Sequence, residues 1–367
     1  MKRDKRQKKD NIIEKRMVIS CVFLVGTVVL TVLSNECDGM AEWYSVHVYA
    51  VIASVIGRIS GLFPFSLAEL CLYVFLILLA GTLIHTLGEA FLRKKGKMAV
   101  LRWGSGVFLA ASVLILLYVT NCGINYHRVS FSEKAGLVLK EYTVEELKQA
   151  CIWLTEEVNR RAGTVRRDIS GVMQLAKPEE EGAVSAMEQL GKTYSCLAGY
   201  YPTPKGLLVS EILSYQSLTG IYSPFTVEAN YNKDMASYNI PFTACHELSH
   251  LRGFMQEEEA NFIAFLACKD SPREDFQYSG YLMGWIYCMN TLRQSDYQEW
   301  EDVRQGLNTL VETDLKENNQ FWASYEGAVA EVSTKVNDTY LKANGQNNGV
   351  QSYDKMVDLI VAYYGEM

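Results

Sequence analysis

Residues 244–253 read Ala-Cys-His-Glu-Leu-Ser-His-Leu-Arg-Gly. The stretch contains His-Glu-x-x-His, in which two histidines stand four residues apart. Side chains four apart share one face of an α-helix, so His246 and His250 can reach one metal ion together. Glu247, next to the first histidine, is placed to hold the water that such a metal activates. The stretch therefore predicts a helix that carries a catalytic zinc site.

A third ligand has to come from another part of the chain, because a catalytic zinc ion usually takes three protein ligands and keeps one position for water. No histidine follows the motif, which leaves a carboxylate. Three glutamates at 257–259 begin the next predicted helix. Glu257 shares one helical face with Ala260 and Asn261, which favours Glu257 as the ligand and leaves Glu258 as the alternative. Asn261 is placed to accept a hydrogen bond from a ligand imidazole.

The connection between these two helices has to be short. Six residues separate His250 from Glu257, and Gly253 is placed to end the first helix in a left-handed conformation. Histidine is also scarce: beyond residue 127, only the two in the motif occur. Two histidines at ligand spacing, in a region that has no others, favour metal binding over core packing.

The first third of the chain differs in composition from the rest. Residues 1–122 hold 14 Lys/Arg and 8 Asp/Glu, a net charge of +6, and because the whole chain carries −7, residues 123–367 carry −13. A basic, apolar region before an acidic, polar one predicts a membrane region at 17–122 and a soluble domain at 123–367. The acidic domain argues against a nucleic-acid partner, since phosphate binding needs clustered Lys and Arg. Three apolar stretches are long enough to span a bilayer: about 17–34, 66–90 and 104–122.

Basic residues predict how these helices are oriented. The leader 1–16 has eight Lys/Arg and the loop 93–102 has five, and the positive-inside rule places both in the cytoplasm. An even number of crossings must then separate them, so the apolar segment 43–65 is predicted to lie in the outer interface and not to cross. A cleaved signal peptide is the alternative for 17–34, but the run is long for one. The third span then leads residues 123–367 out of the cytoplasm, as in a multi-pass plasma-membrane protein.

The soluble part is predicted to be mainly helical with a small β-sheet. Leu207–Val209 is a short β-type run, and residues 225–231 alternate apolar and polar side chains as a half-buried strand does. The nine cysteines form no Cys-x-x-Cys pair, so a thiolate zinc site is not expected. Sequence alone predicts neither disulfide pairs nor the oligomeric state.

The motif at 246–250, followed by Glu257-x-x-Ala260-Asn261, is similar to zinc peptidases whose third ligand is a glutamate in a Glu-x-x-(Ala/Cys)-(Asp/Asn) helix. The membrane peptidases that process prenylated or misfolded proteins, the antirepressor-type peptidases and the β-lactam sensor peptidases share this layout. The spacing from His250 to Glu257 is shorter here than those families usually have. The resemblance implies a zincin-like α+β domain.

The same resemblance implies one zinc ion per chain, held by His246, His250 and Glu257. Glu247 would take a proton from the attacking water and deliver it to the leaving amine. By analogy, the strand at 225–231 would bind a peptide substrate as an added strand, with a plain core strand as the alternative. A further donor should stabilise the oxyanion. Candidates for that donor are Tyr222, Asn230, Tyr231 and Tyr238.

The whole chain resembles a bacterial membrane family, the domain of unknown function numbered 3810. The shared segments are Phe63–Ser66, Gly220–Asn230, Pro241–Glu247, Glu259–Phe262 and Tyr340–Asn344. That family implies no substrate. Taken together, the sequence predicts a membrane-anchored zinc metallopeptidase that hydrolyses peptides or proteins outside the cytoplasm. The alternative is a membrane sensor or scaffold whose zinc site serves signalling or structure.

Overall fold

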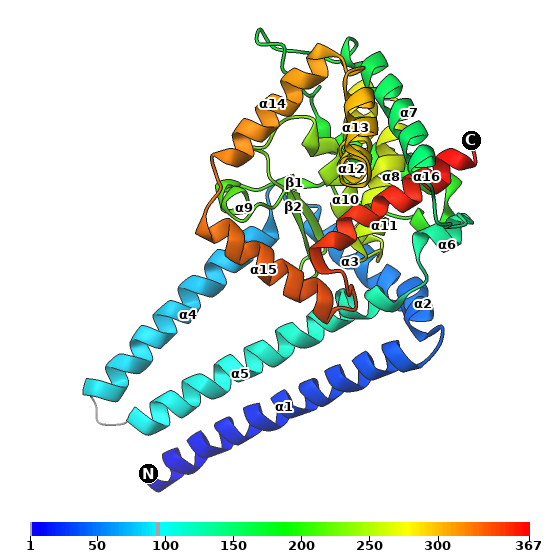
Figure 1. Cartoon of the computed structure of the whole chain (residues 1–367). Helices are drawn as coiled ribbons and strands as arrows, with labels where there is room; N and C mark the ends of the chain where they lie inside the picture. The colour runs from blue at the N-terminus through cyan, green and yellow to red at the C-terminus, as the bar shows by residue number, and fades with distance from the viewer. Residues whose placement is uncertain (1, 93–95) are drawn as a thin grey trace.

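Three long apolar helices form a stem, and the rest of the chain forms a mainly helical domain at one end of it (Figure 1). The computed structural model describes residues 2–92 and 96–367. The stem helices are α1 (Lys2–Glu36), α4 (Leu67–Leu92) and α5 (Gly96–Asn121), and each holds a stretch long and apolar enough to cross a membrane. The three predicted spans are therefore present as helices.

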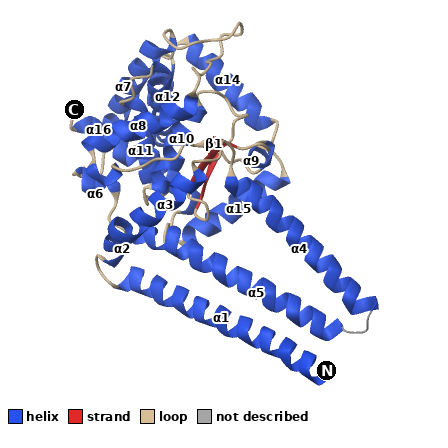
Figure 2. Cartoon of the chain, turned by 180° about the vertical axis from the view of Figure 1, so that it is seen from behind, coloured by secondary structure: helices blue, strands red, loops and turns tan. Residues whose placement is uncertain are grey.

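α4 diverges from the other two stem helices toward the domain. Figures 1 and 2 show α1 beside α5, while α4 meets α5 near the loop and separates from it at the domain end. Arg16 Nη1 donates a hydrogen bond to the Arg102 carbonyl across the α1–α5 contact, at 3.1 Å. Residues 93–95, which supply part of the basic loop used to predict orientation, lie outside the described residues.

The segment predicted to lie in the outer interface, 43–65, packs against the domain. It forms α2 (Met40–Tyr44), a π-helical turn (Ser45–Tyr49) and α3 (Ala50–Ser60). Tyr44 and Tyr49 are buried in the same hydrophobic core as the domain. The segment is thus a structural part of the domain.

The sheet has three short strands, β1 (Lys205–Gly206), β2 (Gly220–Ser223) and β3 (Glu228–Tyr231), in the order β1-β3-β2. β1 pairs with β3 in parallel and β2 pairs with β3 antiparallel. The strand predicted at Leu207–Val209 is wrong: the backbone is extended two residues earlier and turns at 208–210.

The strand predicted at 225–231 is only partly correct. Residues 224–227 form the turn of the β2–β3 hairpin, where Val227 has a φ of +51°. β3 is buried at all four residues and is not half-buried, because it is the central strand. β2 lay outside both predicted strands, since its four residues show no clear alternation.

Two buried carboxylates, Glu228 and Glu69, join the stem helix α4 to this sheet. Lys205 Nζ donates to the Glu228 carboxylate at 2.5 Å, and both side chains are buried. Glu228 also accepts hydrogen bonds from the backbone N–H groups of residues 67–68, the first turn of α4. In return, Glu69 of α4 accepts from the N–H groups of residues 208–209. Carboxylates are stabilised at helix N-termini, so this exchange holds α4 in place.

Helices surround the sheet and enclose the core of the domain, and the predicted mainly α class with a small sheet is confirmed. α7 begins at a capping box, in which Thr143 and Glu146 are bonded to each other's backbone N–H groups. The longer domain helices are α7 (Val144–Ala162), α8 (Glu179–Thr193), α10 (Asn239–Leu251), α11 (Glu257–Lys269), α12 (Glu274–Ser295), α13 (Tyr297–Arg304), α14 (Thr309–Ala323), α15 (Ala328–Ala343) and α16 (Met356–Gly365).

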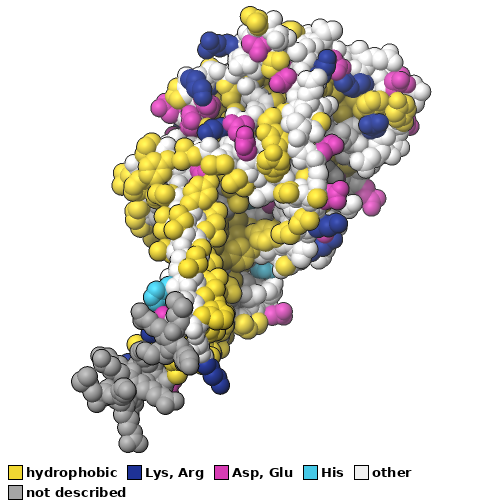
Figure 3. Space-filling view, turned by 90° about the vertical axis from the view of Figure 1, so that its left-hand side faces the viewer, with side chains coloured by type: hydrophobic (Ala, Val, Ile, Leu, Met, Phe, Trp, Pro, Cys, Tyr) yellow, Lys and Arg dark blue, Asp and Glu magenta, His cyan; other side chains and the backbone are white. Residues whose placement is uncertain are grey.

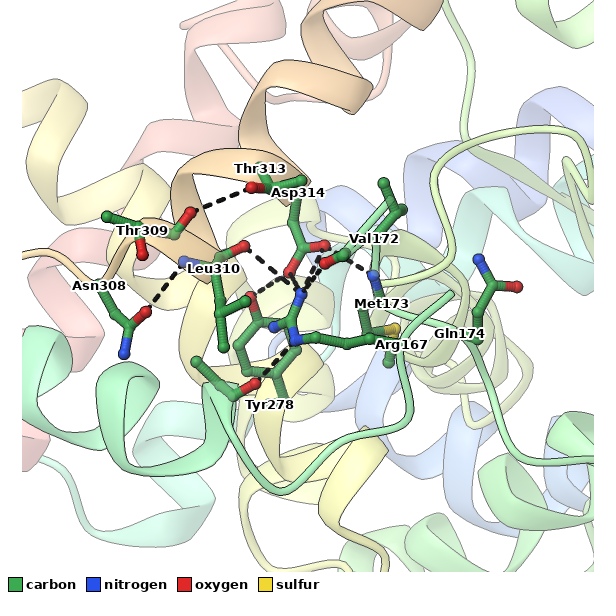
Figure 4. A network of polar contacts seen from close by, with 12 residues as sticks. Arg167, Val172, Met173, Gln174, Tyr278, Asn308, Thr309, Leu310, Thr313 and Asp314 are labelled. Atoms are coloured by element: carbon green, nitrogen blue, oxygen red, sulfur yellow. Dashed lines mark hydrogen bonds and ion pairs between the residues drawn. The ribbon is translucent and has the colours of Figure 1, made fainter. Parts of the chain in front are cut away.

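A polar network far from the motif holds α14 against the domain (Figure 4). Asp314 is buried on α14, and its carboxylate lies 3.1 Å from Arg167 Nη1. Tyr278 of α12 donates to the same carboxylate at 2.5 Å, and the Met173 N–H donates at 2.8 Å. Every acceptor position of this buried carboxylate therefore has a partner, as burial of a charge requires.

Candidate metal centre

The three predicted ligands come together in the structure. α10 carries His246 and His250, and α11 begins with Glu257. The two Nε2 atoms are 3.0 Å apart, and Glu257 Oε2 lies 3.2 Å from His246 Nε2 and 3.7 Å from His250 Nε2. All three side chains are buried. One ion could therefore contact two imidazoles and a carboxylate.

Oxygen acceptors fix the orientation of both imidazoles. His246 Nδ1 is 2.8 Å from Asn261 Oδ1, and His250 Nδ1 is 2.8 Å from the Phe254 carbonyl. An oxygen acceptor at Nδ1 places the ring proton there, which leaves the Nε2 lone pair directed at the shared point. The contact predicted between Asn261 and a ligand imidazole is thus present. The contact from Phe254 follows from the short connection between the helices.

The structure also separates the three glutamates of α11. Glu257 Oε2 is buried and has no hydrogen-bond partner of acceptable geometry among the described residues. Glu258 accepts a hydrogen bond from Gln346 at 2.6 Å, and Glu259 accepts from the N–H and hydroxyl of Ser132 at 2.9 and 2.6 Å. Glu257 is therefore the glutamate that faces the histidines, and the alternative Glu258 is directed elsewhere.

The electrostatics of this cluster favour a cation. Burial alone would raise the pKa of Glu257, but the charge of His250 outweighs it and holds that pKa well below its usual value. Burial would lower the pKa of His250, whereas the Glu257 carboxylate raises it to about 9. Positive charge is thus stabilised at the point where the three side chains meet.

The connection from α10 to α11 is as tight as its six residues require. Gly253 has a φ of +85° and its N–H donates to the His250 carbonyl at 2.8 Å, so the predicted left-handed turn is confirmed. A Cβ at this glycine would lie 3.1 Å from Arg128 Nη1 and 3.3 Å from the Tyr49 ring. The turn is therefore packed between the domain and the segment 40–60.

Glu247 lies beside the histidines, at a point where β2 approaches α10 closely. Its side chain is buried, and burial raises its pKa to about 7, although the charges of His246 and His250 oppose that rise. A Cβ on Gly220 of β2 would lie 2.5 Å from Glu247 Oε1 and 2.9 Å from the Asn230 carbonyl. Only a glycine at position 220 leaves room for this carboxylate.

Two cavities meet at His246 and Glu247. One, of about 300 Å³, extends toward polar side chains of α15, including Ser333 and Asn337. The other, of about 420 Å³, extends past His250 toward the end of α5. His246 and Glu247 are therefore accessible to a small or extended ligand from two sides, and His250 from the side of the larger cavity.

Of the four residues predicted as oxyanion donors, only Tyr222 lines either cavity. Its hydroxyl is 2.8 Å from the Tyr49 hydroxyl, which in turn donates to the Leu251 carbonyl at 3.2 Å. The single hydroxyl proton of Tyr49 is used in that bond, so in the contact between the two tyrosines Tyr222 is the donor. The Tyr222 proton is therefore not available to an oxyanion. Tyr231 donates to Glu180 instead, away from the cluster.

Sequence reasoning missed Tyr353, which lines both cavities beside Glu247. Its hydroxyl is hydrogen-bonded to Asn337, and burial, with Glu257 adding to the effect, raises its pKa well above the usual value. A tyrosine with a raised pKa keeps its proton and can donate it. Tyr353 stands in a short helical turn about a hundred residues after the motif, and no local pattern links the two.

The strand expected to bind substrate is not the one that faces the site. β3, within the predicted segment 225–231, is central and has no free edge. β2 is an edge strand, and its residues Gly220, Ile221 and Tyr222 line the larger cavity. An extended peptide could therefore add only to β2 on this side of the sheet.

Comparison with curated proteins and with solved structures finds no match to this chain. A family model does match, and it covers residues 44–361, which include the segment packed under the turn, the sheet and all three ligands. The match extends over most of the chain. The chain belongs to the family described as Protein of unknown function (DUF3810).

Proposed function

We propose that this protein is a membrane-anchored, zinc-dependent peptidase. The observation that carries the proposal is the convergence of two imidazoles and one buried carboxylate at a cavity that Glu247 also lines. Two histidines and a glutamate are a ligand set that catalytic zinc sites use, with a fourth position kept for water. The chain supplies three ligands here, and the described residues offer no fourth at the cluster.

The donor set fits zinc in three respects. Both ligand histidines have an acceptor at Nδ1, and both Nε2 atoms face the Glu257 carboxylate. Glu257 Oε2 is buried and lies close to both Nε2 atoms, and a cation bound between them would compensate the burial of this carboxylate. Borderline-soft zinc accepts such mixed nitrogen and oxygen ligands.

The reaction follows from the positions of the chain's own groups. Bound zinc lowers the pKa of a water molecule and polarises a scissile carbonyl. Glu247 is placed to take the proton of the attacking water and to return it to the leaving nitrogen. The free edge of β2 aligns an extended substrate across the cavities, and the Tyr353 hydroxyl is the donor available to the developing oxyanion.

The alternative, a structural or signalling zinc site, is less well supported. A closed structural site takes four protein ligands and has no use for a base. Here Glu247 stands beside the ligands, and Gly220 leaves space for its carboxylate. Both features favour a site that performs chemistry.

The proposal is tested with the full-length protein in detergent, because Tyr49 and the rest of segment 40–60 belong to the domain core. Metal analysis should give about one zinc per chain. His246→Ala should abolish binding, and His47→Ala, which changes an exposed histidine outside the site, should not. Zinc retained in full by the His246 variant would overturn the site.

Catalysis is tested with Glu247→Gln. This variant should retain zinc and lose cleavage of a proteome-derived peptide library, since it keeps the ligands and removes the base. Persistent cleavage would show that Glu247 is not the base. We also propose that the domain faces outside the cytoplasm, as the basic leader indicates. The test fuses, after residue 367, a reporter that works only in the cytoplasm. Activity of that reporter would show that the domain faces the cytoplasm and would overturn this orientation.

A further inference from the structure

The larger cavity connects the metal centre to the stem. At one end it is lined by His246, Glu247, His250 and Glu257, and at the other by Tyr118 and Cys122, in and just after the last turn of α5. Tyr118 belongs to the third apolar stretch long enough to cross a membrane. The candidate catalytic residues and the end of a membrane helix therefore share one cavity.

Apolar side chains at the rim of this cavity are exposed and not packed. Ile221 and Phe225, at the β2–β3 hairpin, are 46% and 45% exposed, and Val336 of α15 is 63% exposed. Contiguous exposed apolar surface is rare on soluble domains and marks contact with a membrane or a ligand. These rim side chains are thus suited to contact with a membrane or an apolar ligand.

α15 extends this rim. Val329, Val332 and Val336 lie at helical spacing on one face and are all more than half exposed. Of the sixteen residues of α15, all of them described, only Leu341 is buried. Tyr118 at the end of α5 donates to Asn344, just after α15, at 2.6 Å. An apolar face of a loosely packed helix therefore adjoins the end of a membrane helix.

The valine face of α15 and the domain ends of the stem helices lie near one another in space. In Figures 1 and 2, α15 lies across the opening between the domain ends of α4 and α5. Figure 3 shows hydrophobic side chains over the stem that continue onto the adjoining part of the domain, while charged side chains are scattered over the remainder. Because Tyr118 of α5 lines the larger cavity, that cavity reaches the stem.

We propose that the substrate is a membrane-anchored polypeptide, cut in the segment next to its anchor. That segment reaches the metal centre from the bilayer surface, between the end of α5, the β2–β3 hairpin and the valine face of α15. This proposal rests on the proposed peptidase function and names its substrate class. The exposed valines of α15 would face the bilayer surface in this arrangement. A substrate that arrives from the bilayer surface would reach the cavity along them, whereas a soluble peptide would arrive from water.

The test uses the full-length protein in vesicles of phosphatidylcholine and phosphatidylglycerol. Two substrates carry the same cleavable sequence, taken from the library, and the same apolar anchor helix of about 20 residues. In one, the sequence starts about five residues from the anchor, and in the other a flexible spacer of about 40 residues separates them. Both are equally concentrated at the membrane, so only the distance from the bilayer differs.

We expect the near-anchor substrate to be cut about tenfold faster than the spaced one. Equal rates, or faster cleavage of the spaced substrate, would overturn this inference and leave the peptidase function standing. Cleavage of neither substrate, nor of the soluble library, would overturn both. Val336→Ser, at an exposed valine that lines the larger cavity, should reduce the advantage of the near-anchor substrate, whereas Val138→Ser, at an exposed valine that lines neither cavity of the metal centre, should not.

A second measurement does not depend on turnover. A photo-crosslinking residue at position 336 of the inactive Glu247→Gln protein should capture the near-anchor substrate in vesicles. The same residue at position 138 should not. Capture at both positions, or at neither, would contradict access beneath α15.

Discussion

Asn261 stands one helical turn beyond Glu257 on α11, and its Oδ1 lies 2.8 Å from His246 Nδ1. One face of α11 therefore supplies both a metal ligand and the acceptor that orients a second ligand on α10. The amide nitrogen of Asn261 faces the Tyr287 hydroxyl at 3.4 Å, which fixes the direction of the amide. The geometry of the centre thus depends on the packing of α11 against α10.

Asn261→Ala should lower zinc affinity by about 10- to 100-fold, because the ring of His246 loses the acceptor that sets its tautomer. Competition with a fluorescent zinc chelator measures this. Asn261→Asp keeps an acceptor at the same place and should retain most of the affinity. An alanine variant that binds zinc as tightly as the natural protein would remove Asn261 from the centre.

The three glutamates of α11 should behave differently when each is changed to glutamine. Glu257→Gln should abolish zinc binding, since it replaces the carboxylate ligand. Glu258→Gln and Glu259→Gln should keep about one zinc per chain, because their carboxylates accept hydrogen bonds from Gln346 and Ser132. Metal analysis of the three proteins compares them directly. Loss of zinc in the Glu258 variant alone would reassign the third ligand.

The sequence predicted the ligand cluster because its parts are close together along the chain. His246, Glu257 and Asn261 lie within sixteen residues on two helices joined by one turn, so helical spacing alone relates them. Gly220, Tyr49 and Tyr353 reach the same site from distant segments. No local pattern connects them to the motif, and only the tertiary fold brings them there.

The strands were harder to predict than the helices for a physical reason. Glu228 in β3 looks like a solvent-facing residue in an alternating pattern, but Lys205 pairs with it in the interior. That partner lies 23 residues away, and the other hydrogen bonds to Glu228 come from the start of α4. A buried ion pair of this kind makes an interior strand resemble an exposed one in sequence.

Gly220→Ala should abolish peptide cleavage while zinc is retained. The added Cβ would lie 2.5 Å from Glu247 Oε1, so the base must move while the ligands stay in place. Gly163→Ala is the matched control, since a Cβ there would contact nothing within 4 Å. Full activity in the Gly220 variant would show that Glu247 does not need its present position.

Stability should depend on pH through Glu42 of α2, which pairs with Arg128 and Lys134. Burial raises the pKa of its carboxyl, but the hydrogen bond from Lys134 and the charge of Arg128 outweigh burial and lower it below 4.5. The folded state therefore favours the ionised form, and this stabilisation is complete above pH 4.5 and is lost as the pH falls further.

Glu42→Gln should accordingly lower the melting temperature of the metal-free protein at pH 7, and the difference from the natural protein should shrink as the pH falls below about 4.5. Glu141→Gln, at an exposed glutamate, serves as the control. A difference that is the same at every pH would mean that Glu42 acts through packing and not through its charge.

The buried ion pair between Lys205 of β1 and Glu228 of β3 should be important for stability, because the same Glu228 carboxylate also binds the first turn of α4. Glu228→Gln leaves a buried lysine without its counter-charge and should lower the free energy of unfolding by about 3–5 kcal/mol, measured by denaturant titration with tryptophan fluorescence. Glu312→Gln, at the half-exposed pair with Arg304, should cost less than about 1 kcal/mol.

The double variant Lys205→Met/Glu228→Gln separates charge from shape. It removes the unpaired charge and leaves an acceptor near the first turn of α4, so it should recover much of the stability that the single variant loses. If the double variant is less stable than Glu228→Gln, Lys205 contributes through its hydrogen bond to the Ser60 carbonyl, at 2.8 Å, and not mainly through the ion pair. In that case Lys205 would stabilise the fold mainly by holding the end of α3 against the sheet.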